Sequence, residues 1–461
     1  MIRGLFRFLL NVLRMFVRAL DLVVRGVFYA LLIFGLGVLV SFFFHPEPEV
    51  QAGSALVLRP VGTIVEQAEL EPPLALLRAG GAPAGQLRLA DLVDAVRKAR
   101  DDARIAALVI ETDELVGGGF SKLAELRAAI ADFKASGKPV LARGERFTQS
   151  QYYLASVADE LHLSPDGFVL LRGLARYGTY FRDALDKLGV KVHVFRVGEY
   201  KSFSEPFTRS DMSDEDREAT RDLLDGLWRF MRDDIAASRK LAPAAIDAHV
   251  NDIRGALAAA GGDAAKAALA AGLVDRFSTR DEWRARLIEV VGTDHEGKDV
   301  RTIEAEAYLA LAADDTRHAA GSVAVIVAQG TIVDGAEPAG VVAGDTFARL
   351  IREAREDEDI KALVLRIDSP GGSAWASELI RRELELTRQA GKPVIASMSS
   401  VAASGGYWIA TGADEIWAAP STVTGSIGIF GLFPEFSEPL RRLGIGVDGV
   451  ASAPLAGALD P

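Results

Sequence analysis

The sequence predicts an α/β protein with two tandem βαβ domains behind an N-terminal transmembrane helix. Three observations lead to this prediction: an internal duplication, an alternation of strand-like and helix-like segments, and an uncharged apolar stretch near the N-terminus. The two copies of the duplication lie about 255 residues apart. A period of this length indicates two homologous domains rather than a solenoid. The chain has 461 residues, 49% of them hydrophobic, which suits two ordinary packed cores.

The duplication is visible as short segments that occur twice with small changes. The matching pairs are residues 96–109 with 351–364, 137–140 with 391–394, 158–160 with 413–415, 188–190 with 443–445 and, at a wider offset, 62–65 with 330–333. Because the copies are homologous, the positions at which they differ point to function.

The membrane anchor is predicted at residues 27–44, which carry no charge. Eighteen apolar residues just suffice to cross the hydrocarbon layer. Five arginines precede this stretch and no basic cluster follows it, so the positive-inside rule keeps the N-terminus cytoplasmic and exports the remainder. A cleaved signal peptide is the alternative, but residues 42–46 lack the small residues that cleavage requires. Residues 1–26 are expected to be a basic amphipathic segment on the inner leaflet.

The first repeat is expected at residues 55–280. Short apolar runs at 54–58 and 107–110 are typical of buried strands, and residues 89–100 have helical periodicity. An Ala-rich charged stretch, 213–271, indicates a helical extension of this repeat. Residues 281–320 are expected to connect the two repeats.

The second repeat is expected at residues 321–461. Predicted strands and helices alternate here, which favours βαβ units with mostly parallel sheets. The strands are 323–327, 362–367 and 393–397, and the helices are 346–357 and 374–389. About seventy residues of the first repeat have no counterpart before Pro461. We therefore expect the C-terminal part of the second repeat to be missing and the chain to be marginal or inactive as it stands.

The composition excludes several classes of function. The chain has no cysteine, which excludes disulfides, thiolate metal sites and a cysteine nucleophile. The net charge of −12 argues against binding of nucleic acid. The six histidines are scattered without metal-ligand spacing. No metal and no organic cofactor is expected.

A nucleophile is predicted at Ser404, in the sequence Ala-Ala-Ser-Gly-Gly-Tyr of residues 402–407. A serine followed by two glycines, between an apolar strand and a helix-like segment, is typical of an exposed nucleophile, because the glycines allow a sharp turn. The first copy has Gln149 at the matching position, and an amide is no nucleophile. A serine that caps a helix is the alternative interpretation.

An oxyanion site is predicted at Gly371 and Gly372, which follow a predicted strand and open a helix. Adjacent glycines at a helix N-terminus direct free N–H groups toward one point, which suits a developing negative charge. A tight turn with a serine cap is the alternative here.

A base for the serine is predicted at Lys201 of the first copy. Burial lowers the pKa of a lysine, so that its neutral amine can accept a proton. The matching residue of the second copy is Ala456. One copy has lost the serine and the other the lysine, which a single Ser–Lys site shared between duplicated domains would explain.

These motifs resemble the signal peptide peptidase A family, in its long, duplicated and membrane-anchored form, within the ClpP/crotonase superfamily. The resemblance extends from the anchor to Pro461, and its sharpest segments are residues 200–202, 205–207, 369–373, 402–408 and 424–428. It implies Ser404 as the nucleophile, Lys201 as the general base, Ser426 as the serine that hydrogen-bonds the lysine, and oxyanion donors around Gly371 and Gly372. It also implies a homo-tetramer that removes remnant signal peptides.

The sequence thus predicts a membrane-anchored serine endopeptidase with a Ser–Lys dyad. The expected place is the bacterial inner membrane, crossed once, with the catalytic part in the periplasm. The expected partners are signal peptides and other membrane-associated peptides, the lipid bilayer and further copies of the chain, without nucleic acid. Two alternatives are a catalytically impaired membrane scaffold and a crotonase-like acyl-CoA enzyme. The thioester substrate of a crotonase-like enzyme is cytosolic, so the predicted export of the chain argues against this second alternative.

Overall fold

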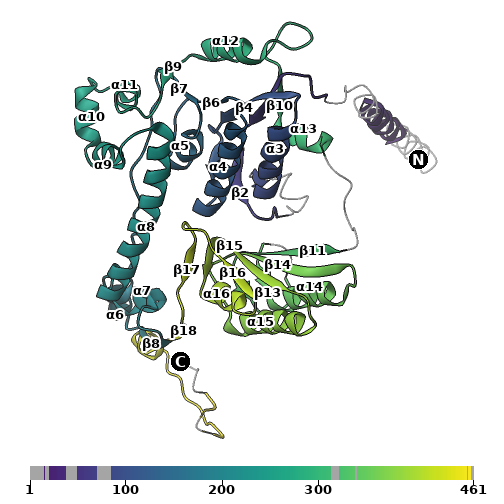
Figure 1. Cartoon of the computed structure of the whole chain (residues 1–461). Coiled ribbons are helices and arrows are strands. Elements are labelled where there is room, and N and C mark those ends of the chain that lie inside the picture. Colours follow the sequence, from purple (N-terminus) through teal and green to yellow (C-terminus); the bar gives the residue numbers. More distant parts are fainter. Residues whose placement is uncertain are drawn as a thin grey trace, which may run out of the picture. The chain divides into compact units, whose positions relative to one another are not determined.

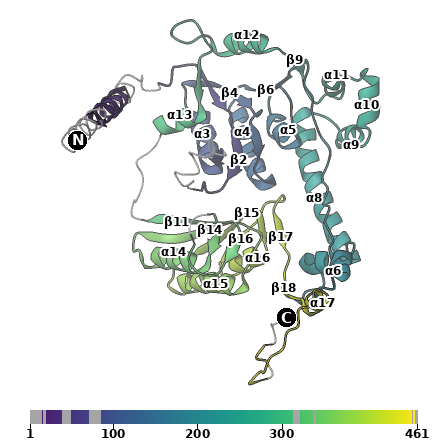
Figure 2. The same ribbon diagram turned by 180° about the vertical axis from the view of Figure 1, so that it is seen from behind.

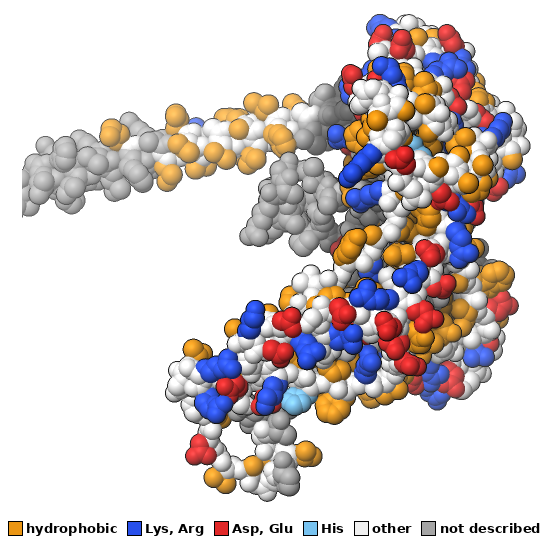
Figure 3. Space-filling model, turned by 90° about the vertical axis from the view of Figure 1, so that its left-hand side faces the viewer, with side chains coloured by type: hydrophobic (Ala, Val, Ile, Leu, Met, Phe, Trp, Pro, Cys, Tyr) orange, Lys and Arg blue, Asp and Glu red, His pale blue; other side chains and the backbone are white. Residues whose placement is uncertain are grey.

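The computed structural model divides the chain into two units, Met1–Glu49 and Val50–Pro461 (Figure 1). The described residues are 15, 20–37, 49–69, 85–312, 321–337, 340–453 and 455–457. In the first unit the described residues form the helix Leu20–Gly37, with mean hydropathy 1.8. Hydrophobic side chains project from this helix in Figure 3. It fits a single-pass membrane anchor and begins before the predicted span at 27–44, of which residues 38–44 lie outside the described residues.

The first repeat is built on a six-stranded parallel sheet with helices on both faces. The order is β10 (Thr302–Glu304), β1 (Ser54–Leu58), β4 (Ile105–Glu111), β6 (Val140–Gly144), β7 (Glu160–Leu163) and β9 (Arg276–Phe277). Side chains of a strand point alternately to opposite faces. Leu56 and Leu108 therefore join the core under α3 (Leu89–Asp101) and α4 (Phe120–Ala135), whereas Val57 and Val109 pack against Trp283 of α12 (Arg280–Val291).

The helical extension predicted for the first repeat is present. It consists of α8 (Asp214–Arg239), α9 (Pro243–Asn251), α10 (Ile253–Ala259) and α11 (Ala264–Ala270). The C-terminal half of α8 buries Met231 and Ile235 in the core of the repeat. Its N-terminal end lies near the small elements α6 (Arg182–Leu188) and α7 (Glu205–Thr208), as Figure 1 shows, and Figure 2 shows α6 in the same place. Helix α8 thus connects the core to the segment that carries Lys201.

The second repeat has a parallel sheet of the same kind. Its order is β11 (Ser322–Gln329), β14 (Ile360–Ser369), β15 (Val394–Ala403) and β16 (Glu415–Trp417), and β17 (Val423–Gly425) also pairs with β15. Helices α14 (Gly344–Glu356) and α15 (Ala374–Gln389) lie on one side of this sheet (Figure 2). The α/β class with two duplicated parallel-sheet domains is therefore confirmed.

The repeated sequence segments make the same contacts in both copies. Lys138 Nζ donates to the carbonyls of Ala99 (2.9 Å) and Asp102 (2.8 Å). Its counterpart Lys392 donates to the matching carbonyls, those of Ala354 and Asp357. These lysines tie the end of α3 to the start of β6 and the end of α14 to the start of β15, so the two Gly-Lys-Pro-Val segments have the same structural role.

Part of the segment expected as a connection belongs to the first sheet. Strand β10 pairs in parallel with β1, and α13 (Ala305–Leu311) buries Tyr308 in the first core. We therefore propose that the first repeat extends to Ala312. Residues 313–320 of the expected connection lie outside the described residues.

A two-stranded antiparallel ribbon joins the repeats. Strand β8 (Lys191–Val197) of the first repeat pairs with β18 (Ile429–Glu435) of the second, with Val197 opposite Ile429. Lys201 follows β8 by four residues, and Ser426 precedes β18 by three. The ribbon therefore brings these two residues to the same place.

Candidate functional site

Lys201 and Ser404 lie in hydrogen-bonding contact, although 203 residues separate them in the chain. The Nζ atom of Lys201 is 2.9 Å from Ser404 Oγ, 2.7 Å from the carbonyl oxygen of Ser426 and 3.1 Å from Ser426 Oγ. Three oxygens therefore surround the amine. They come from the second repeat, whereas the lysine comes from the first.

Ser404 stands on a strained turn between β15 and α16 (Gly405–Ala410). Its φ is 53° and its ψ is −116°, a conformation that is costly for a residue with a side chain. Its N–H donates to the carbonyl of Gly425 at 2.8 Å, which ties the turn to β17. Such a sharp strand-to-helix turn holds a nucleophilic hydroxyl away from the backbone and open to a substrate.

The environment of Lys201 favours the neutral amine. Lys201 as a residue is 5% exposed, and burial lowers the pKa of its amine below the usual value. Among the described residues, no carboxylate forms an ion pair with it that would oppose this shift. A lysine in such surroundings can accept a proton from a hydroxyl at hydrogen-bonding distance.

The loop that carries Lys201 is held by the N-terminal end of α8. Ser202 Oγ donates to Asp216 Oδ1 at 2.6 Å, and Arg176 Nη1 donates to the same oxygen at 2.8 Å. The carboxylate of Glu205 accepts from the backbone N–H (3.0 Å) and hydroxyl (2.6 Å) of Ser213. The lysine is therefore placed by a rigid helix end.

Two free N–H groups lie beside Ser404, and only one is from the predicted glycine pair. The N–H of Gly371 donates to Ser369 Oγ at 3.2 Å, so it is engaged. In the described part of the chain, the N–H groups of Gly372 and Gly405 donate to no acceptor. A Cβ atom added to Gly405 would lie 3.1 Å from the Gly372 nitrogen, so the two donors are close together.

Gly371 is required for the close approach of the loop to the serine. A Cβ atom at this position would lie 2.5 Å from the nitrogen of Gly405 and 2.8 Å from Ser404 Cβ, and its φ is +96°. Such contacts admit no side chain. Gly405 was missed in the sequence, although its place directly after the nucleophile is where a nucleophile elbow supplies an oxyanion donor.

The matching positions of the other copy hold no second site. The side chain of Gln149 accepts from the N–H of Arg172 (3.1 Å) and donates to the carbonyl of Gly173 (3.2 Å). Gln149 therefore holds a loop in place, whereas Ser404 at the matching position of the second copy has its hydroxyl beside Lys201. Ala456 is exposed.

Removal of the Ser426 hydroxyl is expected to lower kcat about tenfold to a hundredfold, because one hydrogen bond to the lysine is lost while the backbone carbonyl remains. Ser426 has φ 52°, so Ser426→Ala keeps the backbone strain and Ser426→Gly relieves it. Peptidase assays of both variants should give similar losses. A slow Ser426→Ala variant together with a normal rate in Ser426→Gly would show that backbone strain, and not the lost hydroxyl, causes the loss of rate.

Comparisons with known proteins place the chain in a family of proteases. The model of peptidase family S49 matches residues 132–293 and 387–461. Protease 4 of Salmonella typhi is 41% identical over 99% of this chain and 74% of its own length. Protease 4 of Haemophilus influenzae is 40% identical over 79% of this chain, and the chloroplastic serine protease SPPA of Arabidopsis thaliana is 31% identical over 84%. The chain spans 60% and 55% of the last two proteins.

Solved structures match over smaller parts. A membrane-bound stomatin-specific protease is 29% identical over 24% of this chain and 49% of its own, with a TM-score of 0.20. An enoyl-CoA hydratase/isomerase family protein from Silicibacter pomeroyi is 16% identical over 53% of this chain and 80% of its own, with a TM-score of 0.28. Similarities at this level carry no conclusion about activity.

Fold and family together define a serine-type protease built from two α/β repeats with parallel sheets. The chain belongs to peptidase family S49 and resembles the signal peptide peptidase A proteins within it.

Proposed function

We propose that the protein is a membrane-anchored endopeptidase in which Ser404 and Lys201 form a catalytic dyad. The observation that carries this proposal is the 2.9 Å contact between Lys201 Nζ and Ser404 Oγ, in surroundings that favour a neutral lysine. The strained backbone of Ser404 and the two free N–H groups beside it support the same assignment. We also propose that residues 55–312 and 321–461 act as the two halves of one catalytic domain.

The reaction begins when neutral Lys201 takes the proton of Ser404 Oγ as this oxygen attacks the carbonyl carbon of a peptide bond. The carbonyl oxygen becomes negative and accepts hydrogen bonds from the N–H groups of Gly372 and Gly405. Removal of one such donor typically costs about 3 kcal/mol in the barrier. Ser426 keeps the amine directed at Ser404.

The intermediate collapses when protonated Lys201 returns its proton to the nitrogen of the leaving amine. The C–N bond breaks and an acyl ester of Ser404 remains. A water molecule then attacks the carbonyl carbon of the ester while neutral Lys201 accepts its proton. The C–O bond to Ser404 breaks, protonated Lys201 returns the proton to Ser404 Oγ, and the carboxylic acid leaves.

We propose remnant signal peptides and other membrane-associated peptides as substrates, and a tetramer of the chain as the assembly. The support is the similarity to the signal peptide peptidase A family together with the apolar helix Leu20–Gly37. Five arginines before residue 27 favour a cytoplasmic N-terminus and a periplasmic catalytic part in the inner membrane of a bacterium.

A fluorophosphonate probe tests the proposed site, because an activated serine oxygen attacks its phosphorus, displaces fluoride and becomes phosphonylated. We expect a single labelled peptide containing Ser404, and no labelling after Lys201→Met. Absence of label in the folded wild-type chain would favour a scaffold. Turnover of an acyl-CoA thioester without turnover of a peptide would favour the crotonase-like alternative.

The rate is expected to rise with pH, because only the neutral form of Lys201 accepts a proton. Burial lowers the pKa of Lys201 below the 10.5 of an ordinary lysine, so the midpoint of the rise in kcat/KM should lie below that value. The measurement is a pH profile with a neutral peptide substrate. A profile that is flat from pH 5 to 9 would contradict lysine as the base.

A further inference from the structure

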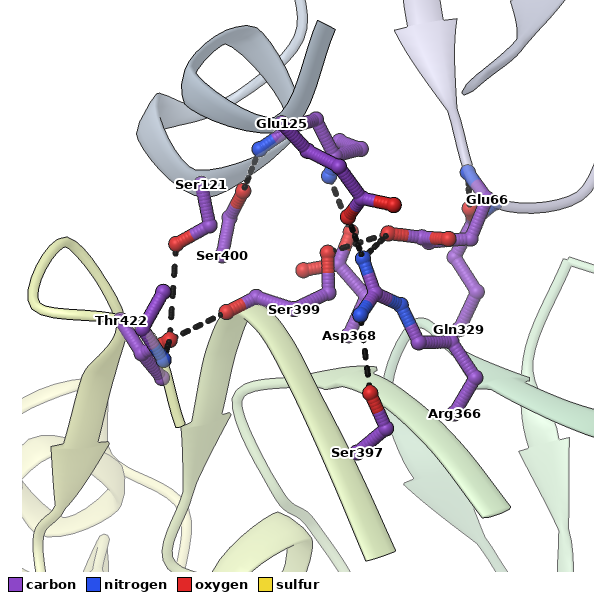
Figure 4. A network of polar contacts seen from close by, with 12 residues as sticks. Glu66, Ser121, Glu125, Gln329, Arg366, Asp368, Ser397, Ser399, Ser400 and Thr422 are labelled. Carbon is purple, nitrogen blue, oxygen red and sulfur yellow. Dashed lines mark hydrogen bonds and ion pairs between the residues drawn. The ribbon is translucent and has the colours of Figure 1, made fainter. Parts of the chain in front are cut away.

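A polar interface joins the first repeat to the sheet that carries Ser404 (Figure 4). The N-terminal end of α4 lies over the ends of β14 and β15. Arg366 Nη2 forms ion pairs of 2.8 Å with Glu66 and with Glu125, and Ser399 Oγ donates to Glu66. The N–H of Lys122, on α4, donates to Ser400 Oγ at 3.4 Å. The interface thus reaches the last residues of β15 before the turn at Ser404.

Within this interface the ladder between β14 and β15 is interrupted. Ile367 lies opposite Met398, but Ser369 lies opposite Ala402, so β15 contains extra residues at this point. Such a bulge leaves backbone groups without ladder partners. Asp368 Oδ1 compensates by accepting the N–H of Val401 at 3.1 Å.

Asp368 therefore links the two parts of the proposed site, which are the Ser369–Gly372 loop and the turn at Ser404. It directly precedes Ser369, whose hydroxyl accepts from the N–H of Gly371 and donates to the carbonyl of Gly330 at 2.6 Å. On the other side, it holds Val401, three residues before Ser404. A shift of this carboxylate would move the free N–H of Gly372 relative to the serine.

The charge of Asp368 is balanced by the first repeat. Its second oxygen, Oδ2, forms an ion pair with Lys122 Nζ. The side chains are only 12% and 6% exposed, respectively. Loss of one partner from a buried pair leaves an uncompensated charge, which is strongly unfavourable and displaces the remaining group toward water.

The other copy has the aspartate but no lysine beside it. Asp113, the counterpart of Asp368, accepts the N–H of Glu145 at 2.9 Å, so the backbone role is shared. No lysine or arginine forms an ion pair with Asp113 in the described chain, and burial raises its pKa. Lys122 is the third residue of α4, and the third residue of α15 is Ala376. The lysine is thus present only where it reaches the copy with the serine.

We propose that Lys122 is a positioning residue for the Ser404 site, which acts through Asp368 to fix the Ser369–Gly372 loop against the turn at Ser404. The first repeat then supplies two lysines, Lys201 to accept the proton and Lys122 to hold the oxyanion donors in register. The inference rests on the proposed role of Ser404. The two are tested separately, since the labelled residue reports the role of Ser404 and the rate of labelling reports that of Lys122.

The test compares the full-length Lys122→Met variant with wild type, using a fluorogenic apolar peptide and the fluorophosphonate probe. We expect kcat and the labelling rate to fall at least tenfold, KM to change less than threefold, and Ser404 to remain the labelled residue. The midpoint of the pH profile should stay in place, because Lys201 is unaffected. Glu125→Gln is the matched control on the same helix and interface, and it should retain at least half of the wild-type kcat.

The double variant Lys122→Met/Asp368→Asn decides whether the lysine acts through the aspartate. It removes both charges and keeps an oxygen that can accept from Val401. We expect it to fold, and its kcat to exceed that of either single variant. The proposal is overturned if the double variant is no more active than the singles, if Lys122→Met keeps more than half of kcat, or if its defect lies wholly in KM. If Lys122→Met does not fold, Asp368→Asn and the double variant give the same comparison.

Discussion

Ser404→Ala is expected to reduce peptide hydrolysis to less than about one hundredth of the wild-type rate while the fold is retained. Loss of a serine nucleophile lowers kcat by up to ~10⁶-fold in serine proteases, because no other group can form the acyl ester. Alanine fits the site, since it removes only the hydroxyl that Lys201 contacts at 2.9 Å. The measurement is kcat/KM for a peptide, with circular dichroism as the check on folding.

Ser397→Ala is the matched control for this variant. It removes a hydroxyl from β15, the strand that leads to the turn at Ser404. Ser397 Oγ accepts from Arg366 Nη1 at 2.9 Å, and its loss should leave the rate near that of wild type. Should the Ser404→Ala protein cleave peptide faster than a hundredth of the wild-type rate, another residue would have to be the nucleophile.

Lys201→Met is expected to be as inactive as Ser404→Ala. Methionine fills a similar volume without an amine, so the hydroxyl of Ser404 would have no base within reach. Groups that act as one unit are strongly non-additive, and the double variant should therefore be no slower than either single variant. The same peptide assay on the three variants gives the comparison. Losses that multiply in the double variant would show that serine and lysine act independently and would remove the dyad.

The sequence predicted the fold because its strands and helices are regular and occur twice. The predicted helix at 374–389 coincides with α15 (Ala374–Gln389), and the predicted strand at 54–58 coincides with β1. The strand predicted at 393–397 continues as β15 to Ala403, because the following Met398 and Ala402 are also buried. The local sequence pattern therefore predicted the first part of this strand but not the residue at which it ends.

The proximity of Ser404 and Lys201 was predictable from the duplication and from the family resemblance, but not from any local pattern. Neither residue has a partner nearby in the sequence, and the contact depends on the pairing of β8 with β18 across the repeats. That pairing has no local sequence signal, because the two strands are far apart in the chain. Gln149 stands at the position of the serine in the first copy, and Ala456 stands at the position of the lysine in the second copy. This complementary loss indicated that the serine and the lysine belong to one site.

Other members of the site could not be derived from the sequence. Lys122 and Asp368 are 246 residues apart, and the sequence around either residue does not indicate an ion pair between them. The engagement of the Gly371 N–H by Ser369 depends on the local loop conformation, so the glycine pair alone did not show which N–H is free. Such details follow from tertiary packing and not from composition or periodicity.

The β8–β18 ribbon has a consequence for when the protein can act during its own synthesis. The chain is made from its N-terminus, so the first repeat and Lys201 emerge long before Ser404 and Ser426. On the proposed assignment, bond cleavage then has to wait until β18 has been made and has closed a loop of 203 residues between base and nucleophile. On the proposed topology, a nascent chain that is still crossing the membrane would carry a base without a nucleophile, and it would be harmless to the unfolded proteins that share its export route.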